Sequence, residues 1–228
     1  MKSQAFEASR TMEDVLLSAG IPPAKLGKCR GERLSPAERE LYVWMLRGFG
    51  DGKPPSADAI RAYATRLGLD PDQPREKLAT EDLIHFDGEG EITVAYPFSR
   101  RPTRHTVRIE GDTVFAMCAI DALGVAPMFE RAIVIDSSDP LTDEGISIWL
   151  QPDGTGTWQP SEAVVVTGRA CADGAAFKGC CQVLNFFASP DSAERYLFEH
   201  EAVSGFPITM PQAVEVGRAI FGAVLKEN

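Results

Sequence analysis

A cysteine and an aspartate three residues apart are the first candidates for chemistry. They lie in the apolar segment Phe115-Ala116-Met117-Cys118-Ala119-Ile120-Asp121. If this segment is helical, the Cys118 thiol and the Asp121 carboxylate share a face. Burial would raise the pKa of Asp121 and keep it protonated near neutral pH, which is the state a proton donor requires. The plainer alternatives are a buried apolar role for Cys118 and a helix cap or arginine partner for Asp121.

A second thiol cluster, Cys180-Cys181, begins an aromatic segment predicted to be a strand over 181–187. Adjacent residues of a strand point to opposite faces, so only one of these sulfurs can join Cys118 in a site. A disulfide between neighbouring cysteines would be strained. Two thiolates and a carboxylate suit a thiophilic metal better than a four-ligand zinc site. Cys29 and Cys171 lack such neighbours and are predicted to be incidental.

Several other kinds of site are excluded by inspection. The chain has no glycine-rich phosphate loop, no Cys-x-x-Cys pair, no His-Glu-x-x-His and no Gly-x-Ser-x-Gly turn. Its three histidines, His85, His105 and His200, are scattered and are predicted to be surface or packing residues. A histidine-based hydrolase or zinc enzyme is therefore disfavoured.

The elements that must position the thiols are mostly short strands. Their sequences are rich in β-branched and aromatic residues and are separated by turn-forming residues, and they fall at 106–109, 132–135, 146–150, 163–166 and 181–187. Two helices are predicted at 189–200 and 211–226. The second half of the chain, 98–228, is therefore predicted to be an α+β catalytic domain.

The first half has a different pattern. A helical extension is expected within 1–34, with a helix over about 11–20. Ser35, Pro36 and Glu38 then form a capping signal for a helix that ends near 48, and further helices are predicted at 56–67 and 70–82. A hairpin over 84–96 completes the order of a winged-helix-like module, 35–97. Its mixed charges favour a packing module over a DNA-binding one.

Composition excludes other classes. In 228 residues, 23 Lys and Arg against 33 Asp and Glu give a formal net charge of −10, which disfavours a nucleic-acid or anionic-membrane surface. The longest nearly apolar run, 114–122, is too short for a membrane helix. Five cysteines are an odd number and no secretory signal precedes them, so we expect a cytoplasmic protein with reduced thiols.

The segments Phe115–Asp121 and Cys180-Cys181-Gln182-Val183-Leu184-Asn185-Phe186-Phe187-Ala188-Ser189 together resemble the organomercurial lyase (alkylmercury lyase) family. The shared features are the Cys-Ala-hydrophobic-Asp motif, the later cysteine and the Phe-Phe-Ala-Ser tail. The resemblance runs from about 35 to the last residue. Two departures stand out: Met117 replaces a tryptophan before the first cysteine, and the segment after the cysteine pair is a residue longer than in some members.

The resemblance implies protonolysis of the carbon-mercury bond of alkyl and aryl mercurials, giving a hydrocarbon and Hg²⁺. It implies that Cys118 and Cys180 bind mercury and that Asp121 relays the proton and contacts the Hg²⁺ product. No cofactor is implied; free thiols act as co-reactant, and mercuric reductase is a candidate recipient of Hg²⁺. The alternative is a non-catalytic winged-helix protein that binds or senses a thiophilic metal. A buried acid beside both thiols favours the enzyme.

Overall fold

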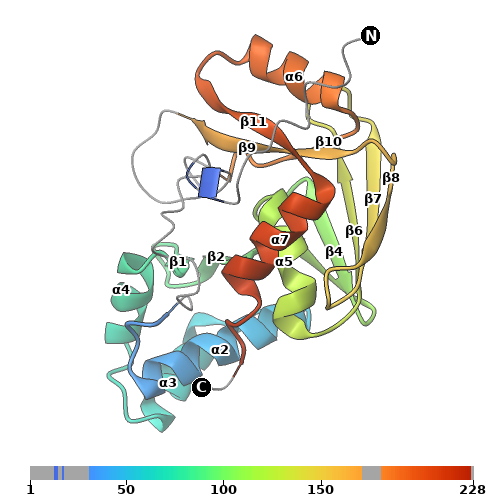
Figure 1. The fold of residues 1–228 in the computed structure, drawn as a ribbon. Helices are drawn as coiled ribbons and strands as arrows, with labels where there is room; N and C mark the ends of the chain where they lie inside the picture. The colour runs from blue at the N-terminus through green and yellow to red at the C-terminus, as the bar shows by residue number, and fades with distance from the viewer. Residues whose placement is uncertain (1–12, 15–16, 18–30, 171–180, 227–228) are drawn as a thin grey trace.

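The chain folds into helices and two antiparallel sheets, and the α+β class is confirmed (Figure 1). The computed structural model describes residues 13–14, 17, 31–170 and 181–226. Most of the helix predicted over 11–20 therefore lies outside the described residues. Among the described helices, none has the length and apolar character needed to cross a membrane.

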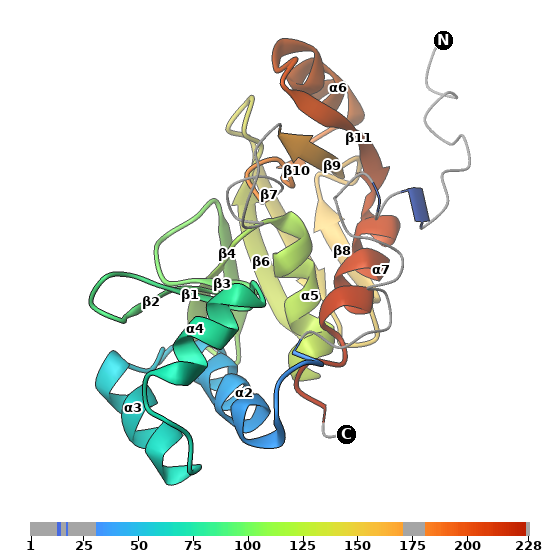
Figure 2. The same ribbon diagram turned by 90° about the vertical axis from the view of Figure 1, so that its left-hand side faces the viewer.

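Three helices and a hairpin follow one another as the sequence predicted. The helices are α2 (Pro36–Gly50), α3 (Ala57–Arg66) and α4 (Gln73–Thr80). Ser35 caps α2 through the reciprocal bonds of a capping box with Glu38. The hairpin joins β1 (Ile84–Phe86) to β2 (Ile92–Ala95). Figure 2 shows these helices grouped at one end of the molecule, beside the hairpin.

The hairpin does not stand apart as an isolated wing. It pairs through β3 (Phe98–Ser99) with the strands of the second half. The strand order of the resulting sheet is β1-β2-β3-β5-β4-β6-β7-β8. The remaining strands of this sheet are β4 (His105–Ile109), β5 (Asp112–Ala116), β6 (Ile133–Ser138), β7 (Gly145–Leu150) and β8 (Gly156–Gln159).

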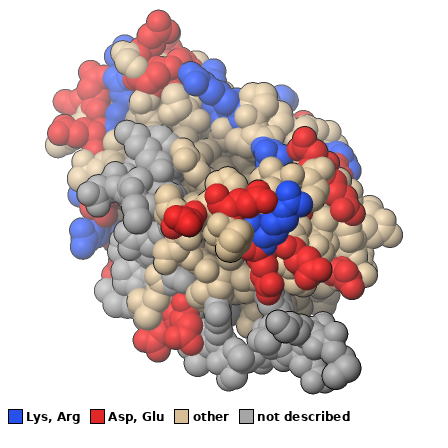
Figure 3. Space-filling view, turned by 90° about the horizontal axis from the view of Figure 1, so that it is seen from above, with Lys and Arg blue, Asp and Glu red and all other residues tan. Residues whose placement is uncertain are grey.

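A smaller sheet has the order β10-β9-β11. Its strands are β9 (Val164–Ala170), β10 (Phe186–Phe187) and β11 (Val203–Thr209), and α6 (Pro190–Glu199) packs against them. The strand predicted over 181–187 is therefore wrong for most of its length, because residues 181–183 form a turn and only the last two residues pair with β9. Seen from above, acidic groups alternate with basic ones over this end of the molecule (Figure 3).

Two helices at the centre pack very closely. They are α5 (Ala119–Phe129), which contacts β4, β5 and β6, and α7 (Met210–Phe221), which covers α5 from the other side (Figure 1). Two glycines allow the contact: a Cβ on Gly217 would lie 2.9 Å from the backbone N of Gly124, and a Cβ on Gly124 would lie 2.3 Å from the Phe221 ring. Residues 119–128 of α5 are consequently all buried.

Candidate active site

The site begins where a strand turns directly into a helix. Strand β5 ends at Ala116, and after Met117 the backbone of Cys118 is still extended, with φ −153° and ψ 177°. Cys118 is the N-cap of α5, a position where serine, threonine or aspartate is usual. The apolar run around Cys118 is therefore part strand and part helix. The Cys118 thiol lies beside the first turn of α5, where it contacts Asp121.

Cys118 and Asp121 bond to each other in both directions. The Asp121 backbone N–H donates to Cys118 Sγ at 3.4 Å, which caps the helix. The Cys118 thiol in turn donates to Asp121 Oδ2 at 3.0 Å. The two side chains meet as predicted, although Cys118 precedes the helix instead of lying within it, and the cap role in this pair belongs to the cysteine and not to the aspartate.

Cys181 supplies the second thiol of the cluster. Its Sγ lies 3.8 Å from Asp121 Oδ2, and the ligand atoms of Cys118, Asp121 and Cys181 all lie within 4.8 Å of one another. We call these three residues the thiol-carboxylate trio. Cys180, the residue singled out by the family resemblance, lies outside the described residues. The sequence predicted that one of the two adjacent sulfurs joins Cys118, and the family resemblance indicated Cys180. The structure places Cys181 beside Cys118.

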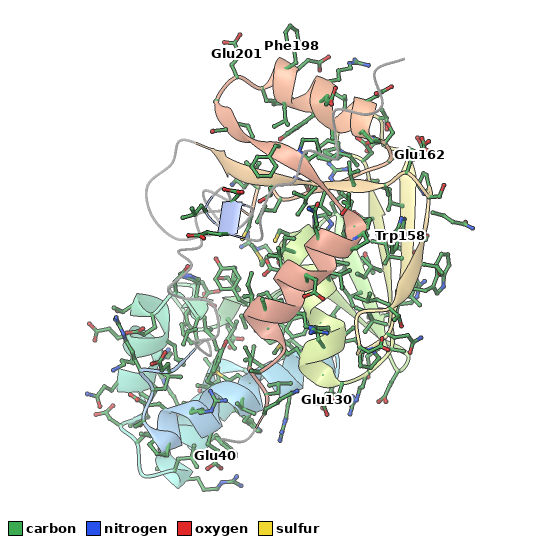
Figure 4. The ribbon with its side chains drawn as sticks, viewed as in Figure 1. Glu40, Glu130, Trp158, Glu162, Phe198 and Glu201 are labelled. Carbon is green, nitrogen blue, oxygen red and sulfur yellow. The ribbon has the colours of Figure 1, made fainter. Side chains whose placement is uncertain are left out.

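The trio is almost completely enclosed. The exposed fractions of Cys118, Asp121 and Cys181 are 1%, 5% and 7%. Labelled acidic residues elsewhere, such as Glu40 and Glu130, lie at the outside of the molecule in Figure 4. Carboxyl groups are rarely buried without a hydrogen-bond partner, and Asp121 Oδ2 has two thiols as partners.

The Cys118 thiol resists losing its proton. Burial raises its pKa from the ordinary 9.0 to about 12, and the negative charge of Asp121 acts in the same direction, whereas a hydrogen bond with Cys181 opposes it. The N-terminus of a helix normally favours a thiolate. Here desolvation outweighs that effect, so Cys118 is a protonated donor to Asp121 at neutral pH.

This raised pKa predicts a loss of stability in alkaline solution. Between pH 9 and about 12 the unfolded chain releases the Cys118 proton while the native state keeps it, so the free energy of unfolding falls as pH rises. The contribution of this group is about 1 kcal/mol per pH unit between pH 9 and 11. Denaturant unfolding of wild type and Cys118→Ala across this range measures it. Equal slopes for the two proteins would contradict the raised pKa.

The aromatic and methionine residues of the two segments that resemble the family do not form one cluster. Phe186 and Phe187 are fully buried, but Phe187 lies in a second apolar cluster and packs against Tyr196 on α6. Phe186 and the partly buried Met117 belong to the main core, and Phe115 is half-buried on β5. Of the histidines, His105 alone is buried, which sequence reasoning did not distinguish from His85 and His200.

A cavity of about 440 Å³ lies at the other end of α5, between Met128, Phe129, Arg47 and Lys226 among others. Ten residues of helix separate Met128 from Cys118, a length of about 15 Å. None of the trio lines this cavity. Among the described residues, the trio offers two soft sulfur ligands and a carboxylate oxygen that accepts a hydrogen bond from both thiols.

Comparison with known proteins points to one family. The family model described as alkylmercury lyase matches residues 98–222. An alkylmercury lyase of Streptomyces lividans is 27% identical over 191 residues, covering 83% of this chain and 86% of that protein. One of Staphylococcus epidermidis is 27% identical over 188 residues, covering 82% and 84%. A crystal structure titled as the mercury-bound form of MerB2 has a TM-score of 0.71 at 21% identity, covering 86% of this chain and 95% of that one, and so shares the fold.

Proposed function

This chain belongs to the alkylmercury lyase family, because the family model spans more than half of it, and we propose that it cleaves the carbon-mercury bond of alkyl and aryl mercurials by protonolysis. The products are a hydrocarbon and Hg²⁺. The observation that carries the proposal is the buried trio, in which one carboxylate oxygen lies within 3.0 Å and 3.8 Å of two thiols. Sulfur is the preferred ligand of soft metals, and a carboxyl group can carry a proton.

The first step joins mercury to a thiol. The substrate R-Hg-X, where X is a thiolate or halide, loses X⁻ as Cys118 Sγ bonds to mercury, and the Cys118 proton passes to Asp121 Oδ2. The existing hydrogen bond from this thiol to Oδ2 supports the transfer. The high pKa of Cys118 makes an internal proton acceptor necessary at neutral pH.

The second step breaks the carbon-mercury bond. Cys181 Sγ bonds to mercury, which raises electron density on the attached carbon, and protonated Asp121 delivers its proton to that carbon. The hydrocarbon R-H leaves with this proton. The Cys181 proton goes to the vacated Asp121 carboxylate and from there to solvent with X⁻. Two thiols and R-Hg-X thus give R-H, HX and mercury bound by two sulfurs, so atoms and charge balance.

Release of Hg²⁺ needs other thiols. Two protein sulfurs in an enclosed site hold mercury strongly, and exchange with small thiols or with a reductase's cysteines removes it. Both reacting cysteines must be reduced at the start, and Cys118 and Cys181 are thiols in the structure. These requirements support a role in a reducing compartment such as the cytoplasm, in mercury detoxification, with no cofactor.

For the N-terminal part, residues 35–97, we propose a winged-helix-like packing module without DNA affinity, followed by the catalytic domain at 98–228. The cations of α3 are already engaged within the protein. Arg61 pairs with Asp72 at 3.4 Å, and the Arg66 guanidinium lies 4.3 Å from the centre of the Tyr63 ring. A phosphate-binding helix needs its basic side chains available.

The function is tested with phenylmercury acetate and excess cysteine in D₂O, with benzene measured by gas chromatography and mass spectrometry. The expected product is benzene carrying one deuterium, because the new C–H bond takes its hydrogen from exchangeable thiol and carboxyl groups. Cys118→Ser is the matched control and should release none above the uncatalysed rate. Stoichiometric Hg²⁺ binding without benzene from folded wild type would instead identify the alternative, a non-catalytic metal-binding protein.

A further inference from the structure

A buried histidine next to the site has no part in the proposed chemistry. His105 begins β4 and is 2% exposed. Its Nδ1 lies 2.9 Å from Ser137 Oγ on β6, its ring meets the Phe186 ring edge-on at 5.5 Å, and its side chain is hydrogen-bonded to Asn185. A buried imidazole that is in contact with Ser137, Phe186 and Asn185 is held in one orientation.

Asn185 connects this histidine to the segment that carries the second thiol. Its Nδ2 donates to the carbonyl oxygen of Gln182 at 2.9 Å, and Gln182 directly follows Cys181. The backbone carbonyl of Asn185 accepts from the Val166 N–H at 3.1 Å, which fixes the residue against β9. The turn at 181–183 therefore depends on a side chain for part of its backbone hydrogen bonding.

The same histidine is tied to the strand that leads to the first thiol. In the β4–β5 ladder, His105 pairs with Ala116, two residues before Cys118. The Ala119 N–H at the start of α5 donates to the Leu184 carbonyl at 2.8 Å, so the 181–185 segment also contacts the helix that Cys118 caps. His105 thus links the strand that leads to Cys118 with Asn185, which belongs to the segment that supplies Cys181.

We propose that His105 and Asn185 are positioning residues that hold Cys181 at the distance from Cys118 and Asp121 needed for mercury to be bound by both sulfurs. Neither touches a reacting atom; they act through the Gln182 carbonyl. The role in turnover rests on the proposed function, whereas the positioning of the thiol does not.

His105 is expected to stay neutral near pH 7, so its contacts do not change with pH in that range. Burial, assisted by the nearby Arg104, lowers the pKa of His105 to about 3, so the ring is neutral near pH 7. The hydrogen bond with Asn185 acts in the opposite direction and raises the pKa of His105, but burial outweighs it.

The test compares the full-length variants His105→Leu, His105→Gln and Asn185→Leu with wild type. Glutamine can still donate to Asn185, whereas leucine cannot, so recovery in His105→Gln separates the hydrogen bond from simple filling of space. His85→Leu is the matched control, since His85 is a partly buried histidine bonded to Asp82, at 2.7 Å, on the hairpin. Thermal unfolding establishes that each variant is folded.

Two readouts follow the thiol itself. The first is the rate of Cys181 alkylation by iodoacetamide, located by tandem mass spectrometry. The second is the affinity for Hg²⁺ alone, measured by competition with dithiothreitol, together with the ultraviolet sulfur-to-mercury absorption. In His105→Leu and Asn185→Leu we expect Cys181 to react about tenfold faster and Hg²⁺ to bind about tenfold more weakly, the effect of one lost hydrogen bond. The double variant should show no further change.

Wild-type values of both readouts in folded His105→Leu would overturn the proposal, as would equal losses in His105→Gln and His105→Leu. If wild type binds Hg²⁺ through Cys181 but releases no hydrocarbon, the proposed function fails while the positioning role stands. If wild type releases hydrocarbon and the variants leave Cys181 unchanged, the positioning role fails alone.

Discussion

Replacing Asp121 with asparagine is expected to stop hydrocarbon release while leaving the thiols able to bind mercury. The amide keeps the size of the carboxyl group but cannot receive the Cys118 proton and pass it to carbon. Loss of proton transfer by a positioned group typically costs about 10²–10⁴-fold in rate. We expect the rate of benzene formation from phenylmercury to fall by that factor in Asp121→Asn, measured under single-turnover conditions.

The control for this variant is Asp82→Asn, the same change at an acid that pairs with His85 far from the trio in sequence. It should release benzene at the wild-type rate. Hg²⁺ binding by Asp121→Asn, measured through sulfur-to-mercury absorption, distinguishes a lost proton relay from a collapsed site. Near wild-type turnover by folded Asp121→Asn would remove the carboxyl group from the mechanism.

The adjacent cysteines are expected to differ sharply. Cys181 Sγ lies within hydrogen-bonding reach of Asp121, so Cys181→Ser should leave mercury with a single sulfur ligand and reduce turnover to about one-thousandth or less. Cys180→Ser changes the neighbouring residue by the same single atom. We expect it to keep turnover within about threefold of wild type, as for a substitution outside the reacting groups.

Both variants are assayed with phenylmercury and excess cysteine, and Hg²⁺ stoichiometry is measured alongside. A large loss in Cys180→Ser with full activity in Cys181→Ser would reverse the assignment and favour the residue to which the family resemblance first pointed. Equal large losses would mean that the pair acts together.

Local signals in the sequence were sufficient for the elements that do not depend on distant partners. Ser35, Pro36 and Glu38 predicted the start of α2 at the residue where it begins. The Ser189-Pro190 pair did the same for α6, where Ser189 accepts from the Ser192 N–H. Caps are made within four residues, so the sequence contains nearly all the information that specifies them.

The parts that could not be predicted depend on pairing across the chain. The apolar run around Cys118 has no turn residue to mark the change from β5 to α5, and burial of α5 on every side removes its helical periodicity. The Asn185 side chain bonds to the Gln182 carbonyl in the turn at 181–183, and the start of α5 bonds to Leu184 just after it. A strand pattern in the sequence does not reveal these contacts. A strand pattern therefore did not apply at Cys181, whose place beside Cys118 and Asp121 depends on contacts with segments distant in the sequence.

The glycine contact between α5 and α7 fixes how far one helix can slide along the other. A screw displacement of α7 by one residue, about 1.5 Å along its axis and about 100° around it, would bring Val216 or Arg218 to the place of Gly217, where even a Cβ lies 2.9 Å from the Gly124 backbone nitrogen. Cys118 begins α5 about 9 Å along the axis from Gly124. Close packing at Gly124 and Gly217, nearly two helical turns from Cys118, thus limits where Cys118 Sγ lies along the axis of α5. A methyl group added at Gly217 would shift Cys118 although it contacts neither the sulfur nor Asp121.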